Sequence, residues 1–295
     1  MMDVEKKEER GVEEFKMEFK IIKKTDGLLA LELSEACEAE VNTIRRLIIS
    51  EVPTMAIEEV EFIKNDSALF DEMLANRLGL IPLTTEAGLY NEVDECKCKG
   101  KGCPLCRVEF SLKAKGPGPI YASELLSKDE KVKPVFDKIP IVKLLEGQEL
   151  ILNATAILNR GKSHMKHSPA AVFYNNKPIL KITNDAKKLE QFKDKLPQEA
   201  IKDGKLDEEA LLKDNLYEAC EGVCEELLKI DYEEDKFMFY IESFGQLAAV
   251  DVLIVALEKF NEKIDAFGKA LKGNNTEKVV KDVVKAAKKV TALKK

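Results

Sequence analysis

Alternating hydrophobic and polar residues at the start of the chain predict a hairpin of two half-buried strands. We expect the strands over residues 15–21 and 29–33, with Thr25-Asp26-Gly27 as the turn between them. A lone two-stranded hairpin is at best marginally stable, so it needs more sheet and a covering helix. The end of the chain supplies both, because residues 237–241 alternate again and an amphipathic helix follows from Gln246. The pattern therefore predicts one domain built from both ends of the chain, with a large insert between them.

The segment after the hairpin has the pattern of an amphipathic helix with a rich apolar stripe. Its apolar face holds Cys37, Val41, Ile44 and Ile48, and its flank holds Asn42, Arg45 and Arg46. We expect Ser34 to cap this helix and Pro53 to end it before an extended apolar segment. The stripe fits a core helix of an ordinary domain, which the pattern alone slightly favours, or a face shared with a partner chain.

The insert has the pattern of mixed helices and strands. A helix is expected over residues 67–78, capped by Asn65 or Asp66 and closed by Gly79. Further strands are expected over residues 108–114, 150–158, 172–174 and 179–182, the last two around an Asn175-Asn176 turn, and a lysine-rich helix over residues 276–293. The fold class is therefore α+β: a discontinuous domain of sheet plus two long helices, with an inserted mixed α/β domain.

Composition narrows the class of protein. The 295 residues are 45% hydrophobic and 34% charged, which is globular and long enough for two domains. A net charge of -7 argues against a free-standing nucleic-acid binder. No apolar run reaches membrane-span length, and the charged start MMDVEKKEERGVEE is unlike a signal peptide, so we expect a cytoplasmic protein. Two histidines and dispersed acidic residues leave no evident catalytic site, and none is predicted.

The strongest chemical motif is a group of four cysteines in eleven residues: Cys96, Cys98, Cys103 and Cys106. Four thiolates at this spacing can wrap one tetrahedral cation, and Zn²⁺ favours such closed, four-sulfur structural sites. The alternatives are an iron–sulfur site or four unliganded surface thiols, which would be prone to oxidation. We expect structural zinc, with no open position for catalysis.

A second pair of cysteines, Cys220 and Cys224, stands four residues apart on a predicted helix. Its apolar face also carries Leu216, Val223 and Leu227, so buried core thiols are the simplest interpretation. Two cysteines are too few to hold an iron–sulfur cluster alone, and we expect no cluster there.

The segment from Gly161 to His167 superficially looks like a phosphate-binding loop. A P-loop needs a glycine five residues before the Gly-Lys pair, and Ala156 stands there instead. The loop is therefore either a positive interface loop, with Lys162, His164 and Lys166 as docking residues, or a plain solvated loop.

Two motifs carry a resemblance to a known family. The run Asn42-Thr43-Ile44-Arg45-Arg46 before Pro53, and NDSALFDEMLANRLGLIPL over residues 65–83, resemble the signature of the alpha-like subunits of cellular RNA polymerases. The organisation is most similar to the archaeal D-type member of this group, which resembles the eukaryotic third-largest subunit and the bacterial alpha amino-terminal domain. Weaker resemblance extends over residues 15–270.

The resemblance implies a domain plan. A dimerisation domain would comprise residues 15–50 and 229–270, with an insert domain over 51–167 that contains the zinc loop 96–106. Residues 168–228 would be a degenerate ferredoxin-like subdomain, expected without a cluster and with Cys220 and Cys224 as its possible vestige. Residues 271–295 would form a lysine-rich helical tail.

The resemblance also implies a function: a non-catalytic assembly subunit of DNA-dependent RNA polymerase. It would pair with a small alpha-like subunit, dock the large catalytic subunits, and meet DNA only indirectly; no membrane partner is expected. The expected interface residues are Val41, Asn42, Ile44, Arg45, Arg46, Ile48, Leu247, Ile254 and Leu257, with Arg45 and Arg46 toward a large subunit. The alternative function is an iron–sulfur redox or redox-sensing protein.

Overall fold

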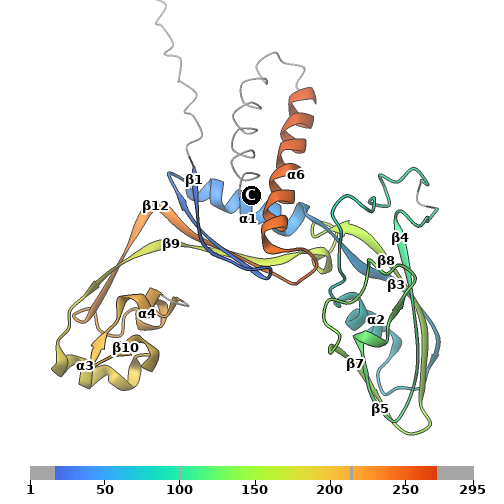
Figure 1. The fold of residues 1–295 in the computed structure, drawn as a ribbon, viewed down its shortest axis with the longest axis horizontal. Helices are drawn as coiled ribbons and strands as arrows, with labels where there is room; N and C mark the ends of the chain where they lie inside the picture. Colours follow the sequence, from blue (N-terminus) through green and yellow to red (C-terminus); the bar gives the residue numbers. More distant parts are fainter. Residues whose placement is uncertain (1–16, 100, 213–214, 271–295) are drawn as a thin grey trace, which may run out of the picture.

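The computed structural model describes residues 17–99, 101–212 and 215–270. Its sheets are antiparallel and combine with helices, so the predicted α+β class is confirmed at that level. Figure 1 shows a central sheet beside α1 and α6, a larger β-rich part beyond one end, and a smaller part beyond the other. No helix within the described ranges combines the length and apolar character needed to cross a bilayer.

The central sheet joins strands from distant parts of the chain. In order, its antiparallel strands are β1 (Glu18–Lys24), β2 (Leu28–Ser34), β12 (Leu228–Ser243) and β9 (Ala170–Ile182). Leu31 of β2 pairs with Phe239 of β12, so the predicted hairpin is confirmed and a late segment completes its sheet. The predicted strand over 237–241 is only part of β12, and Phe15 lies outside the described residues.

Two helices, α1 (Glu38–Glu51) and α6 (Ala249–Ala270), pack on this sheet. Their apolar residues share one buried core with the sheet, including Leu31, Val41, Ile48, Phe239, Val252 and Ile254. The prediction that Ser34 caps α1 is wrong, because Ser34 ends β2 and Cys37 occupies the cap position. There the Glu40 carboxylate accepts a 2.9 Å hydrogen bond from the Cys37 amide, which is the half of a capping box that the third helical residue supplies.

The larger β-rich part is built on a second sheet. Its strand order is β3 (Pro53–Asn65), β8 (Glu149–Arg160), β4 (Arg107–Lys115) and β6 (Leu126–Ser127), while β5 (Gly118–Tyr121) pairs with β7 (Pro140–Leu144). The remaining elements here are the helix α2 (Asp71–Gly79) and the short 3₁₀ helices η1 (Ala122–Glu124) and η2 (Met165–His167). The predicted strands over 108–114 and 150–158 are confirmed.

The helix predicted from residue 67 begins four residues later than expected. Asn65 and Ser67 form a hydrogen-bonded turn instead, in which the Asn65 Oδ1 atom accepts from the Ser67 amide at 3.0 Å. The Asn65 side-chain amide also donates to the Asp71 carboxylate at 2.8 Å, so the cap signal sits in the turn that leads into α2.

The smaller part packs around the far ends of β9 and β12. Its elements are α3 (Ala186–Phe192), η3 (Lys193–Lys195), η4 (Gln198–Ala200), β10 (Ile201–Lys202), β11 (Lys205–Leu206), α4 (Glu208–Leu212) and α5 (Tyr217–Cys220). They enclose a separate core that includes Leu189, Leu196, Leu211, Tyr217 and Leu228. The lysine-rich helix predicted over 276–293 lies outside the described residues.

Two local predictions fail in this region. The Asn175-Asn176 turn is wrong, because β9 continues through both residues and pairs them with Met238 and Phe237 of β12. The helix predicted to carry both Cys220 and Cys224 is also wrong, because α5 ends at Cys220.

Candidate metal centre

The four cysteines of the loop 96–106 converge in space. Their sulfur atoms all lie within 4.8 Å of one another, the one such metal-compatible group among the residues that the structure describes. The Sγ–Sγ distances are 3.5 Å between Cys96 and Cys103, 3.6 Å between Cys98 and Cys106, and 3.7 Å between Cys103 and Cys106. The spacing that the sequence predicts is thus a genuine three-dimensional cluster.

Local backbone geometry makes this convergence possible. The amides of Cys106 and Arg107 both donate to the Cys103 carbonyl, at 2.9 and 3.0 Å, which turns the second half of the loop back on itself. Gly102 has a φ of +84°, a left-handed conformation that glycine adopts without steric cost. The Cys103 amide donates to the Cys106 sulfur at 3.3 Å, which is the kind of bond that stabilises a thiolate.

The thiols differ in their acidity because their surroundings differ. Burial opposes ionisation of Cys98, but bonds from the Cys96 and Cys106 thiols and the Gly102 amide outweigh it and lower the pKa of Cys98 to about 6. Burial raises the pKa of Cys106 to about 12. Cys98 is thus the thiol of this group that favours the thiolate form, the form that binds metal ions.

The geometry fits one tetrahedral ion. Zinc–sulfur bonds of about 2.3 Å in a regular tetrahedron separate the sulfurs by about 3.8 Å, close to the distances between these cysteines. A multi-iron cluster needs thiolates that reach different iron atoms, whereas these four surround a single point. The residues present therefore fit a closed single-ion site.

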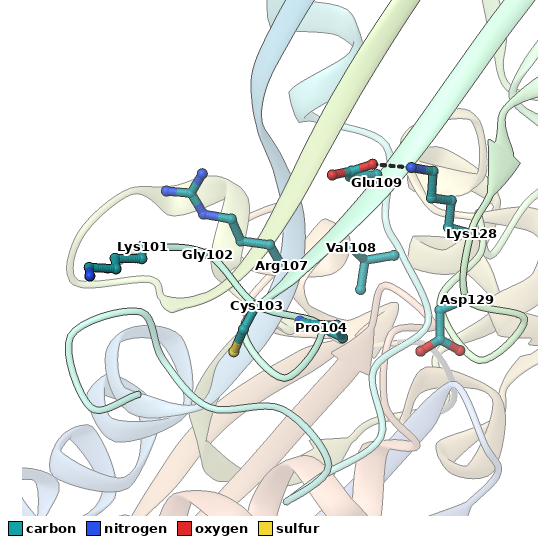
Figure 2. A pocket seen from close by; sticks show the side chains of 9 residues that line it. All are labelled: Lys101, Gly102, Cys103, Pro104, Arg107, Val108, Glu109, Lys128 and Asp129. Carbon is teal, nitrogen blue, oxygen red and sulfur yellow. Dashed lines mark hydrogen bonds and ion pairs between the residues drawn. The ribbon is translucent and has the colours of Figure 1, made fainter. Parts of the chain in front are cut away.

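A cavity of about 510 Å³ lies beside the metal loop, lined by Lys101, Gly102, Cys103, Pro104, Arg107, Val108, Glu109, Lys128 and Asp129. Figure 2 shows Lys101 and Arg107 extending to one side, with the Glu109–Lys128 ion pair on the other. The Arg107 Nε atom is buried without a hydrogen-bond partner among the described residues. The described lining contains no histidine, and its one cysteine belongs to the metal group.

The predicted interface residues divide into two sets. Val41, Ile44, Ile48 and Ile254 are buried in the chain's own core, where α1 and α6 pack together. Leu247 and Leu257 are half-buried at the edge of that core, and Asn42, Arg45 and Arg46 lie on the flank of α1. The Arg45 Nε atom donates to the Asn42 side chain at 3.0 Å, so the two flank residues are already oriented.

The predicted docking loop is partly committed to internal contacts. The Lys166 ammonium donates to the Ile57 carbonyl at 2.9 Å and pairs with the Glu58 carboxylate at 2.5 Å, whereas Lys162 and His164 are exposed. The sequence pattern did not single out His167 as a structural residue, yet it is fully buried and bonds Thr54 through both its ring and its carbonyl. Burial lowers the pKa of His167, which favours the neutral ring.

Cys220 and Cys224 lie in the core of the smaller part. Cys220 is 1% exposed, Cys224 is half-buried beside it, and Val223 and Leu227 contribute to the same core. Burial raises the pKa of the Cys220 thiol, which favours the neutral form. The expected environment of a core thiol is confirmed for Cys220, whereas Cys224 lies at the edge of that core, and the helix expected to carry both is wrong.

Comparison with known proteins defines first the class and then the family. The family model described as the RNA polymerase Rpb3/RpoA insert domain matches residues 57–186, which include most of the second sheet and the metal loop. This chain is similar to proteins named DNA-directed RNA polymerase subunit Rpo3. The relative from Methanosarcina mazei is 38% identical over 257 residues, covering 84% of this chain and 96% of the relative. Those from Thermococcus kodakarensis and Pyrococcus furiosus are each 36% identical, covering 85% of this chain and 96% and 95% of the relatives.

The chain belongs to the family of DNA-directed RNA polymerase subunit Rpo3. The prediction of an RNA polymerase assembly subunit is therefore confirmed, and the redox alternative is not favoured. The relatives carry the name Rpo3, and the comparison does not confirm the D-type designation.

Proposed function

We propose that this chain pairs with a small alpha-like subunit and then docks the large catalytic subunits of a DNA-dependent RNA polymerase. In this role it supplies no catalytic residue and meets DNA only through the assembled enzyme. The family relationship supports the role of assembly subunit. The observation that carries the choice of surface is the helix pair α1–α6, which continues as an apolar surface beyond its own core.

That continuation lies mainly on α6. Leu247, Val250, Leu257 and Phe260 are only half-buried, and Phe267 is 65% exposed. Figure 1 shows α6 rising from the sheet, so that its second half extends past the strands. Large exposed apolar patches mark interfaces, and obligate interfaces resemble a domain core cut in half. In this proposal the buried residues Val41, Ile44, Ile48 and Ile254 act by holding the two helices in place.

The remaining assignments complete the proposal. The four loop cysteines hold one structural Zn²⁺ ion, which the sulfur spacing favours. Lys162 and His164 present a positive docking loop on the surface, with Lys166 fixing its base. Residues 168–228 form a ferredoxin-like subdomain without a cluster, for which Cys220 and Cys224 supply too few ligands. The protein works in the cytoplasm.

Substituting Ile44→Asp tests whether the packed helix pair α1–α6 is needed for partner binding. Ile44 is 7% exposed between the helices and the sheet, so the substitution buries an unpaired charge and misplaces α1. Truncating a buried isoleucine alone costs about 2–5 kcal/mol, and the charge adds to that cost. We expect loss of co-purification with the small subunit, measured on co-expressed chains, with the metal loop still occupied.

A matched control is Ile63→Asp, the same change at an isoleucine of β3 that is 61% exposed. It is expected to leave pairing intact. Arg45→Ala should spare the pair but weaken co-purification of the large subunits. A normal pair formed by Ile44→Asp would refute the proposed role of the helix pair.

A further inference from the structure

One guanidinium connects the metal loop to the helix pair. Arg160 ends β8, and its Nε and Nη2 atoms contact the Glu92 carboxylate at 2.7 and 2.6 Å. Nη2 also lies 3.2 Å from the Glu95 carboxylate. On its other side, Nη1 lies 3.6 Å from the carboxylate of Glu51, the last residue of α1. Three carboxylates from two separate segments therefore share one side chain.

Glu92 and Glu95 are joined by backbone hydrogen bonds to the turn that leads into Cys96, the first metal ligand. The Glu95 amide donates to the Glu92 carbonyl at 3.1 Å, and the Cys96 amide donates to the Val93 carbonyl at 3.4 Å. This turn places Glu92 and Glu95 immediately ahead of Cys96. An ion that fixes Cys96 therefore also fixes the carboxylates that hold Arg160.

On the helix side, the charge of Glu51 depends on its contacts with Arg160 and Lys263. Its side chain is 6% exposed, and it stands at the carboxyl end of a helix, where the helix dipole disfavours a negative charge. Only partners of opposite charge make such a carboxylate tolerable, and it has Arg160 on one side and Lys263 of α6 on the other. The Lys162 amide donates to the Ser50 carbonyl at 3.1 Å and holds the chain after Arg160 against the end of α1.

Charge balance at Arg160 is consistent with this arrangement. Burial opposes the charged guanidinium, but the hydrogen bond to Glu92 and the nearby Glu95 and Glu51 outweigh it and raise the pKa of Arg160. The side chain is therefore a permanent cation whose position depends on all three carboxylates. A displacement on either side changes the contacts on the other.

We propose that Arg160 is a positioning residue that couples metal binding at the cysteine loop to the packing of α1 against α6. Such coupling is reciprocal: an ion that orders the loop favours the packed helices, and packed helices favour retention of the ion. Any effect of this coupling on partner binding rests on the proposed function. The coupling between zinc binding and helix packing concerns the single chain and is tested without a partner.

The test measures transfer of Zn²⁺ from the full-length, metal-loaded chain to a chromogenic chelator. Glu51→Gln keeps the shape of the side chain and removes the charge at a position outside the metal loop. It should speed zinc release about tenfold, a typical size for coupled sites. Arg160→Lys should act in the same direction, because one ammonium cannot hold three carboxylates in the geometry of a guanidinium. The double variant should release zinc no faster than Arg160→Lys alone.

The matched control is Arg77→Ala, an arginine of α2 in the same β-rich part. Its side chain donates hydrogen bonds to the Pro140 and Ile141 carbonyls. It should lower thermal stability without changing zinc release. Hydrogen exchange over residues 258–266 supplies the reciprocal readout: removing zinc should lower protection there in the native chain but not in Glu51→Gln.

Two results would overturn the proposal. Zinc release from Glu51→Gln at the native rate would make Arg160 a local brace only. A Glu51→Gln effect that persists undiminished in the Arg160→Lys background would route the coupling elsewhere. Neither result depends on partner binding, so failure here is distinct from failure of the proposed function.

Discussion

Two segments of this chain carry groups of cysteines, and they differ in what surrounds the thiols. The metal loop 96–106 and the segment 217–227 each contain a left-handed glycine, Gly102 with φ of +84° and Gly222 with φ of +72°. In the first, four sulfurs lie within 4.8 Å of one another. In the second, the cysteines face leucine, valine and tyrosine side chains. The number of cysteines and their neighbours both make the metal loop, and not the segment 217–227, suited to an ion.

The pKa values of Cys98 and Cys220, one thiol from each segment, shift in opposite directions. Hydrogen bonds outweigh burial and lower the pKa of Cys98 to about 6, whereas burial alone raises the pKa of Cys220. A thiolate binds metal and a neutral thiol behaves as a small apolar group. The metal loop therefore contains one thiol, Cys98, that favours the ionised form, whereas Cys220 favours the neutral form.

The largest expected effect is loss of the metal from the first segment. Cys103→Ser or Cys106→Ser should release the single bound Zn²⁺ and loosen residues 90–110, because three ligands no longer close the site. Binding energies of structural zinc reach about 10–16 kcal/mol in isolated zinc-finger peptides, so this loss dominates local stability. Elemental analysis and limited proteolysis measure both effects. Iron with visible absorbance in the native chain, or no metal at all, would contradict the assignment.

A smaller effect is expected from Cys220→Ser in the second segment. The serine hydroxyl is buried in an apolar core, which costs about 1–3 kcal/mol by mutational measures, while zinc content stays unchanged. Cys220→Ala is the matched control, since it removes the sulfur without adding a polar group. Denaturant unfolding measures the stability of each variant, and metal analysis measures its zinc content. Anaerobic purification that yields a stoichiometric iron–sulfur cluster, lost in Cys220→Ser, would show that this segment binds metal after all.

The smallest effects come from the paired glycines. Gly222→Ala meets open space and should cost only the strain of a left-handed residue, about 1–2 kcal/mol. Gly102→Ala adds a contact of 2.9 Å between the new methyl and the Arg107 Cδ atom, so Arg107 must also move. We expect a larger loss of stability for Gly102→Ala, together with faster zinc release, measured by thermal unfolding and chelator transfer. Equal losses of stability in the two variants, with zinc release unchanged, would contradict the prediction that Gly102 matters more than Gly222.

The sequence predicted those parts of the fold that repeat a period over many residues. The strands around Leu112 and Leu152 and the helices that contain Ile44 and Ile254 follow directly from alternation or helical spacing. The metal cluster was also predictable, because its four ligands lie in one short loop whose closure needs no distant contact.

Predictions failed where distant segments outweigh local signals. Asn175 and Asn176 favour a turn, but β12 pairs with both, and their side-chain amides bond the Glu218 carboxylate at 2.5 Å and the Glu233 carbonyl at 3.1 Å. The predicted helix through Cys224 ends at Cys220 and is followed by the left-handed Gly222. The three carboxylates around Arg160 gave no sequence signal, since they meet only when α1, β8 and the loop are assembled.

The pairing of β2 with β12 has a consequence for how the chain is made. After β2, the ribosome must add roughly 200 residues before β12, the strand on the other side of β2 from β1, exists, which takes about 10–40 s at ordinary elongation rates. The second sheet, β3-β8-β4-β6, can close during this interval, because its strands all come from residues 53–160. During this interval the apolar face of β2 and α1 lacks β12 and α6, which bury it in the folded chain. Synthesis order thus favours an early insert and a late central sheet, which leaves the nascent amino-terminal hairpin the segment most in need of protection from aggregation.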